Sequence, residues 1–193
     1  MALLPGSKAP HFTLNSVLDG QQEKVSFLFI NFIIETTPIS YLQVTLSQFR
    51  GQHLLVMFYP VDFGYVTPTE FYSLAPLLPD LSDMNCTLLA ISTEHISSQM
   101  KSQITPRSVP SIFYHRKITK WYRSQAGLDL LGVRLASDPV GEVARQYGVY
   151  KAEENLAFSA FYLIDPEGNI VAMEKCDFPV EHLTFLHFEL LST

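Results

Sequence analysis

The sequence predicts an α/β protein in which helices flank a central mixed β-sheet, and two features carry this prediction. The first is a pair of near-continuous apolar runs, 54–59 and 86–92, typical of strands buried on both faces of a sheet. The second is a hairpin formed by residues 157–164 and 170–174 around the turn-forming residues 165–169. Helical segments separate these strands, so the order of elements indicates helices packed on a sheet.

The predicted helices have recognisable boundaries. Pro68 suits the first turn of a helix, with Thr67 as its N-cap, and we expect this helix to end near Pro79. A second capped helix is predicted over residues 137–147, where a glycine follows the last residue. Residues 180–191 are expected to form a closing helix.

Length and composition favour one folded domain over residues 1–193, because 47% of the residues are hydrophobic. The net charge of −6 argues against nucleic acid as a partner, and the scattered basic residues argue against a membrane-binding patch. The longest apolar run, 27–34, is much shorter than the roughly 20 residues that span a bilayer. Residues 1–8 show no secretory signal and only two cysteines occur, so we expect a cytoplasmic location.

Seven blocks of the chain carry a family resemblance: residues 6–12, 44–51, 58–70, 86–92, 137–149, 161–168 and 177–180. In this order, the blocks resemble the typical 2-Cys peroxiredoxins, which are thioredoxin peroxidases of the AhpC-TSA type. The resemblance implies a thioredoxin-like fold of the peroxiredoxin subtype and, as the family activity, thioredoxin-dependent reduction of hydrogen peroxide. It also implies a homodimer, formed through the sheet edge at residues 170–175 or the loop at 60–69. Thioredoxin would be a partner if redox activity is retained.

The resemblance also implies four groups at the peroxidatic site: an attacking cysteine thiolate, a threonine and an arginine that position the peroxide, and a shielding proline. Pro60 matches the proline. Gly64 stands at the threonine position, Thr67 at the cysteine position and Ser159 at the arginine position. A threonine hydroxyl cannot be oxidised to a sulfenic acid as a thiol can. We therefore predict a degenerate site with no catalytic residue intact, no cofactor, and at most a role as a non-catalytic binding and dimerising scaffold.

An alternative hypothesis is a peroxidase that uses a relocated thiol. Cys176 follows a lysine, which could lower its pKa, whereas Cys86 begins an apolar strand and is more typical of a buried structural residue. Metal binding is not predicted, since the closest histidines, His182 and His187, would point about 140° apart on a helix.

Two segments look inserted relative to the family, residues 25–43 and 96–119. Lys24-Val25-Ser26 can be encoded as AAG-GTA-AGT, which resembles a splice donor, and Gln43 can be encoded as CAG, which resembles an acceptor. The first segment could therefore be a translated short intron, and the chain could be the product of a decaying or mis-spliced gene. The rival interpretation is a hairpin or edge-covering segment whose apolar surface needs a partner.

Overall fold

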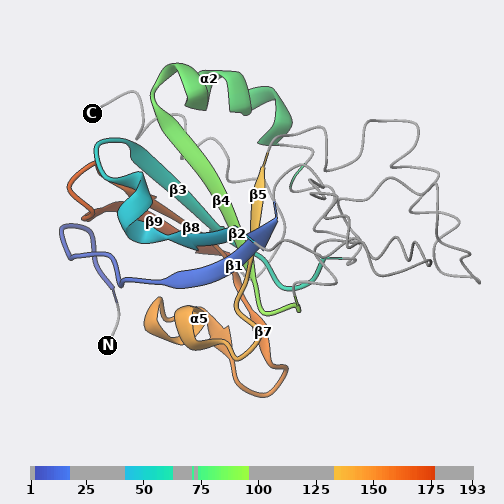
Figure 1. Ribbon diagram of the computed structural model, residues 1–193. Helices are drawn as coiled ribbons and strands as arrows, with labels where there is room; N and C mark the ends of the chain where they lie inside the picture. Colours follow the sequence, from blue (N-terminus) through green and yellow to red (C-terminus); the bar gives the residue numbers. More distant parts are fainter. Residues whose placement is uncertain (1–2, 18–41, 63–70, 72–73, 96–132, 177–193) are drawn as a thin grey trace, which may run out of the picture.

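The computed structural model describes residues 3–17, 42–62, 71, 74–95 and 133–176, and within these residues it forms one large sheet (Figure 1). The large sheet has the strand order β2-β1-β5-β4-β3-β8-β9, and β6 and β7 form a separate two-stranded ribbon. The strands are β1 (Thr13–Val17), β2 (Leu42–Thr45), β3 (His53–Phe58), β4 (Cys86–Ser92), β5 (Arg134–Ser137), β6 (Tyr150–Lys151), β7 (Leu156–Ala157), β8 (Ser159–Ile164) and β9 (Ile170–Cys176). The helices are η1 (Leu46–Phe49), η2 (Ala75–Leu77), α2 (Leu78–Asp83) and α5 (Glu142–Gln146).

The sheet is mixed, as predicted. β4 lies between β3 and β5 and is parallel to both, whereas β8 and β9 continue the sheet in antiparallel order. On the other side, β1 is antiparallel to β5 and to β2. The two apolar runs of the sequence are the central strands β3 and β4, with β3 beginning and ending one residue earlier than expected.

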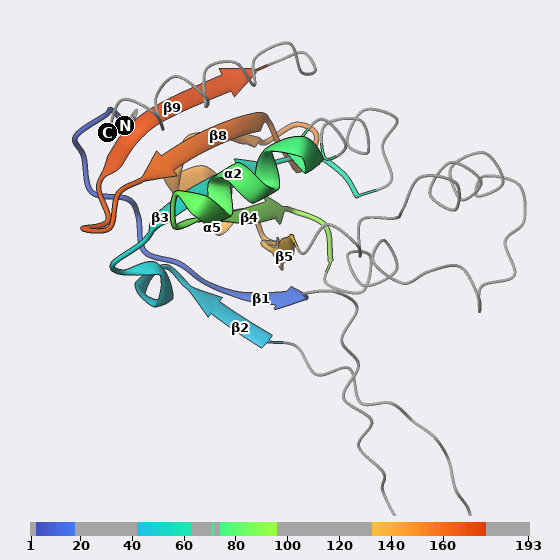
Figure 2. The ribbon, with the colours of Figure 1, turned by 90° about the horizontal axis from the view of Figure 1, so that it is seen from above.

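Both faces of the central strands are covered, which explains why these strands are apolar throughout (Figures 1 and 2). Leu54, Val56 and Phe58 of β3 pack in one core cluster with residues of α5. Leu55 and Met57 pack in a second cluster with residues of α2, on the opposite face. α2 and α5 therefore lie on opposite sides of the sheet.

Three aromatic rings fill the core between β3, β8 and α5. The ring centroid of Phe58 lies 5.2 Å from that of Tyr147 and 5.9 Å from that of Tyr162. The hydroxyl of Tyr162 donates a hydrogen bond of 2.6 Å to the backbone carbonyl of Tyr147. This bond satisfies two polar groups that are otherwise buried, and it ties β8 to the end of α5.

The helix boundaries differ from the predictions. Pro79 does not end a helix but lies in the first turn of α2, which continues to Asp83, because a proline in the first turn removes no intrahelical bond. The second helix begins at Glu142 rather than Ser137, which is the last residue of β5. Asp138 caps it from outside, since its carboxylate accepts hydrogen bonds from two backbone amides of α5, at 2.9 and 2.8 Å.

The predicted hairpin is β8 and β9, but Ala157 belongs to β7 and pairs with Tyr150 of β6. The N–H of Phe158 donates to the carbonyl of Val149, which extends the pairing of the short ribbon by one residue before β8 begins at Ser159. Strands β1 and β2 were not predicted, although buried and exposed residues alternate along β1. The predicted helix start at Thr67 and Pro68, the closing helix and the second inserted segment lie outside the described residues.

Candidate functional site

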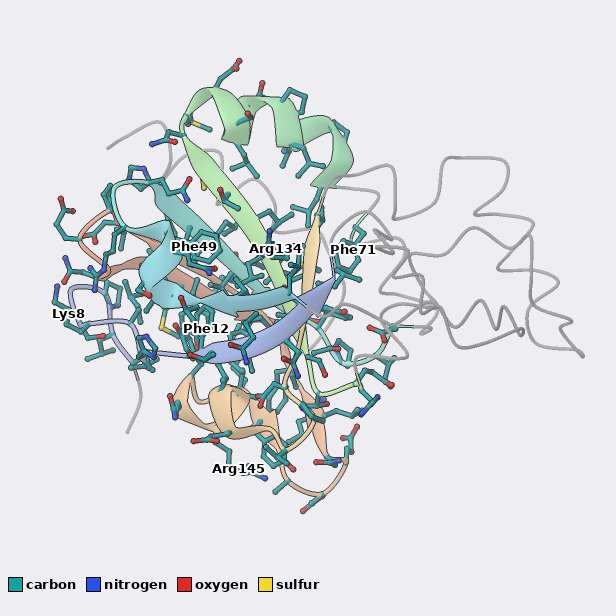
Figure 3. All side chains as sticks on the ribbon, in the orientation of Figure 1. Lys8, Phe12, Phe49, Phe71, Arg134 and Arg145 are labelled. Atoms are coloured by element: carbon teal, nitrogen blue, oxygen red, sulfur yellow. The ribbon has the colours of Figure 1, made fainter. Side chains whose placement is uncertain are left out.

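The loop that follows β3 is fixed to the neighbouring strand at its first residue. The backbone N–H of Tyr59 donates to the carbonyl of Ile91 in β4, at 3.1 Å. The Tyr59 side chain is 1% exposed, and its ring packs edge-on against that of Phe71 with centroids 5.3 Å apart. Phe71 is labelled in Figure 3. The chain therefore enters Pro60 from a rigid position at the carboxyl end of β3.

A buried carboxylate holds the next part of this loop. Asp62 is 2% exposed and accepts a hydrogen bond of 2.7 Å from the Tyr59 hydroxyl. The hydroxyl of Ser92, at the end of β4, donates to the same carboxylate oxygen at 3.5 Å. Because a buried carboxylate is costly without such donors, these bonds select one conformation of residues 59–62.

The structure brings two of the four predicted site residues to the same end of the sheet. Pro60 is half-buried just beyond the end of β3, and Ser159 is half-buried at the start of β8. Phe58 pairs with Ala160 across β3 and β8, so Ser159 lies one residue beyond the last paired position, beside the loop. The other two predicted residues, Gly64 and Thr67, lie outside the described residues.

Cys86 is unsuited to thiol chemistry at this loop. It is 6% exposed at the start of β4, and burial raises the pKa of its thiol from 9.0 to about 11, against a smaller lowering by a backbone hydrogen bond with Leu55. It pairs with His53 at the opposite end of β3 from Pro60. At a rise of about 3.3 Å per residue, these two ends of the strand are about 20 Å apart.

Cys176 has a different place in the fold. It is the last residue of β9 and lies directly across from Ser159 in the antiparallel pair of β8 and β9. The sequence suggested Lys175 as a group that could lower the pKa of Cys176. The ammonium of Lys175, however, lies 3.6 Å from the ring centroid of Phe158, and that of Lys151 lies 4.3 Å from the same ring. Lys175 pairs with Ala160, and successive residues of a strand face opposite sides of the sheet. Lys175 therefore lies on the opposite face of the sheet from Ser159 and from the position paired with it, Cys176.

Among the residues that the structure describes, no group of three or more histidine, cysteine, aspartate or glutamate side chains could hold a metal ion. Within the same residues, no helix is long and apolar enough to cross a membrane. The strand register, which brings Pro60, Ser159 and Cys176 to the same end of the sheet, defines the candidate site as the loop after β3 together with the start of β8 and the end of β9.

Comparison with known proteins assigns the chain to a family. The model of the AhpC/TSA family matches residues 5–173. The chain belongs to the AhpC/TSA family. The peroxiredoxin resemblance of the sequence is thereby confirmed.

Over 175 residues the chain is 27% identical to peroxiredoxin prdx-2 of Caenorhabditis elegans and to peroxiredoxin-2 of Mus musculus. These alignments cover 91% of this chain and 70% and 71% of the two relatives.

Solved structures of AhpC/TSA proteins share the fold. The reduced 2-Cys peroxiredoxin of Plasmodium vivax superimposes with a TM-score of 0.73 at 21% identity, covering 97% of this chain and 94% of that structure. AhpC of Enterococcus faecalis gives a TM-score of 0.71 at 20% identity, covering 100% and 92%. The thioredoxin-like fold of the peroxiredoxin subtype is therefore confirmed.

One part of the site in this AhpC/TSA chain was not predicted. The buried carboxylate of Asp62 accepts hydrogen bonds from Tyr59, three positions away in the sequence, and from Ser92, 30 positions away. The single local signal was a charged residue inside an otherwise apolar stretch, between Val61 and Phe63. Such a residue is compatible with an exposed loop as well as with a buried anchor, so only the pairing of β3 with β4 identifies its role.

Proposed function

We propose that this AhpC/TSA protein has lost thiol peroxidase activity and acts as a non-catalytic binding and dimerising scaffold. The observation that carries the proposal is the composition of the loop and its surroundings. Where the family resemblance expects a cysteine, a threonine and an arginine, the chain has Thr67, Gly64 and Ser159. Pro60 alone matches the expected group.

The chemistry of peroxide reduction explains why these replacements matter. A thiolate attacks one peroxide oxygen, the O–O bond breaks, the second oxygen leaves as water after protonation, and the sulfur becomes a sulfenic acid. Thr67 offers no sulfur to oxidise, and its hydroxyl does not ionise near neutral pH. Ser159 carries no positive charge to stabilise a thiolate or the leaving oxygen, and Gly64 offers only backbone groups.

The chain keeps the buried core and the sheet of the family fold, which supports a binding role for a folded protein. The core is closed on both faces, and the loop after β3 is anchored through Asp62. β9 is an edge of the described sheet, so its outer backbone groups can pair with the same strand of a second copy. We therefore propose a homodimer through this sheet edge, at residues 170–175. We further propose one domain that carries two inserted segments, located in the cytoplasm.

A second candidate is a thioredoxin-dependent peroxidase that uses Cys176. The observation in its favour is the strand register, which gives Cys176 a position directly across from Ser159, at the same end of the sheet as the loop after β3. Cys86 is a weaker candidate for this chemistry, because it is buried at the other end of the strands and the pKa of its thiol is about 11.

The deciding experiment measures hydrogen peroxide consumption with thioredoxin or dithiothreitol as the reductant. The proteins are the wild type, Cys176→Ser, Cys86→Ser and the triple variant Gly64→Thr/Thr67→Cys/Ser159→Arg. No turnover by the wild type would support the loss of activity, and turnover by the triple variant would show that the scaffold still accepts the chemistry. Wild-type turnover that disappears in Cys176→Ser would establish the second candidate instead.

A separate measurement tests whether the protein is made at all. Folded, full-length protein detected in cells by quantitative mass spectrometry after gentle fractionation would support the scaffold. Its absence, together with abundant transcript, would support the product of a decaying gene.

A further inference from the structure

We infer that residues 25–43 are a removable insert, and that a chain spliced without them forms the same β1–β2 pair, with Glu23 and Lys24 taking the places of Leu42 and Gln43. This inference does not depend on the proposed loss of peroxidase activity. It rests on the register of the two strands, on which positions of β2 are buried, and on the residues that flank the segment.

The register defines what each position of β2 must supply. Leu14 of β1 lies opposite Val44 and is 9% exposed, whereas Val44 is fully buried. Asn15 lies opposite Gln43, and Ser16 lies opposite Leu42. Val44 therefore occupies a buried position that requires an apolar residue. Leu42 and Gln43 occupy the two positions before it.

Those two preceding positions are exposed. Gln43 is exposed, and 44% of Leu42 is accessible to solvent. The hydroxyl of Ser16 donates to the backbone carbonyl of Leu42 at 2.8 Å, a bond that any residue at that position can accept. Nothing in the described contacts therefore requires the side chains of Leu42 or Gln43.

Removal of residues 25–43 joins Lys24 directly to Val44. Lys24 then lies opposite Asn15 and Glu23 opposite Ser16, and Val44 keeps its buried place opposite Leu14. β2 is an edge of the described sheet, where charged side chains are favoured because they discourage pairing with other chains. The connection after β1 becomes residues 18–22, a short segment containing Asp-Gly, which is a common hairpin turn sequence.

The composition of the segment supports its being dispensable. Residues 27–34 read Phe-Leu-Phe-Ile-Asn-Phe-Ile-Ile, with no charge and no proline. Such a run has the β-propensity and low charge of an aggregation-prone segment. The codons available for Lys24-Val25-Ser26 and for Gln43 allow splice signals at both ends of the segment. Splicing at these signals would join Lys24 to Val44, which is the same junction that keeps Val44 in its buried position.

The test compares two deletions that differ by one residue, Δ25–43 and Δ25–44. In Δ25–43 we expect cooperative urea unfolding with a midpoint no lower than that of the full chain, and a larger soluble fraction in size-exclusion chromatography. In Δ25–44, Lys24 takes the buried position of Val44 opposite Leu14, so we expect a markedly lower midpoint. Equal destabilisation of both deletions, or equal tolerance of both, would overturn the inference.

Point variants of the full chain test the same requirement without a deletion. Leu42→Glu/Gln43→Lys should leave the urea midpoint unchanged, whereas the matched variant Val44→Lys should lower it. If the double variant is destabilised as strongly as Val44→Lys, the positions are not interchangeable and the inference is wrong.

Amplification of cellular transcripts across this region tests the splicing itself. A product lacking the 19 codons of residues 25–43 is expected, and the full-length product alone would refute splicing.

Discussion

The buried thiol of Cys86 predicts a loss of stability at alkaline pH. In the folded protein burial raises its pKa from 9.0 to about 11. In the unfolded chain the thiol is solvated and loses its proton about two pH units earlier. Between these two values the unfolded state binds fewer protons than the folded state, so the free energy of unfolding decreases as the pH rises. The contribution of Cys86 is therefore fully present below pH 9 and is lost towards pH 11.

The size of the effect follows from the shift. One pKa unit corresponds to about 1.4 kcal/mol, so the full loss above pH 11 would be about 3 kcal/mol. At pH 10 the unfolded thiol is mostly ionised and the folded thiol is not, and the loss is about 1.4 kcal/mol. Even the loss at pH 10 is a substantial fraction of the about 5–15 kcal/mol by which native proteins are stabilised.

The assay is urea unfolding between pH 7 and pH 10 in a Cys176→Ser background, where Cys86 is the single thiol. The control is Cys176→Ser/Cys86→Ala, which carries the same tyrosines and lysines and so reports every other alkaline titration. We expect the stability difference between the two proteins to shrink by about 1.4 kcal/mol from pH 7 to pH 10. A difference independent of pH would refute the reasoning. Rapid alkylation of Cys86 in the native protein at pH 8 would contradict its burial.

Substitutions at four further positions test the packing around α5. Asp138→Ala should lower the free energy of unfolding by about 1–2 kcal/mol through loss of the capping bonds, and Asp138→Asn by less, because one acceptor oxygen remains. Tyr162→Phe should cost about 1 kcal/mol, since the carbonyl of Tyr147 loses its buried donor; an unchanged urea midpoint would argue against that bond. Gly141→Ala should destabilise by about 1–3 kcal/mol, because Gly141 has a φ of 67° and a Cβ there would overlap the ring of Tyr150. Adding Tyr150→Ala should recover the steric part of that loss and not the backbone part, as measured by thermal unfolding of the double variant.

Local sequence patterns predicted the central strands well and the helix boundaries less well. The runs that form β3 and β4 are apolar because both of their faces are covered. Such a run can be recognised in the sequence without knowing which strands lie beside it. Pro79 was interpreted as the end of a helix, since a proline is equally compatible with the start of the next one. Ser137 and Asp138 form a capping sequence, yet only Asp138 caps α5, because pairing with β4 draws Ser137 into β5.

The sequence by itself determined the family, the α/β fold and the candidate loss of three site groups, because these depend on residue identity and on local hydrophobic pattern. Tertiary structure decided which distant residues meet. It placed Cys86 at the far end of the strands from Pro60, brought Ser159 across from Cys176, and buried Asp62 against Ser92 of β4. Strand order and register arise from contacts between segments far apart in the chain, and no local pattern specifies a partner for an edge residue or a buried carboxylate.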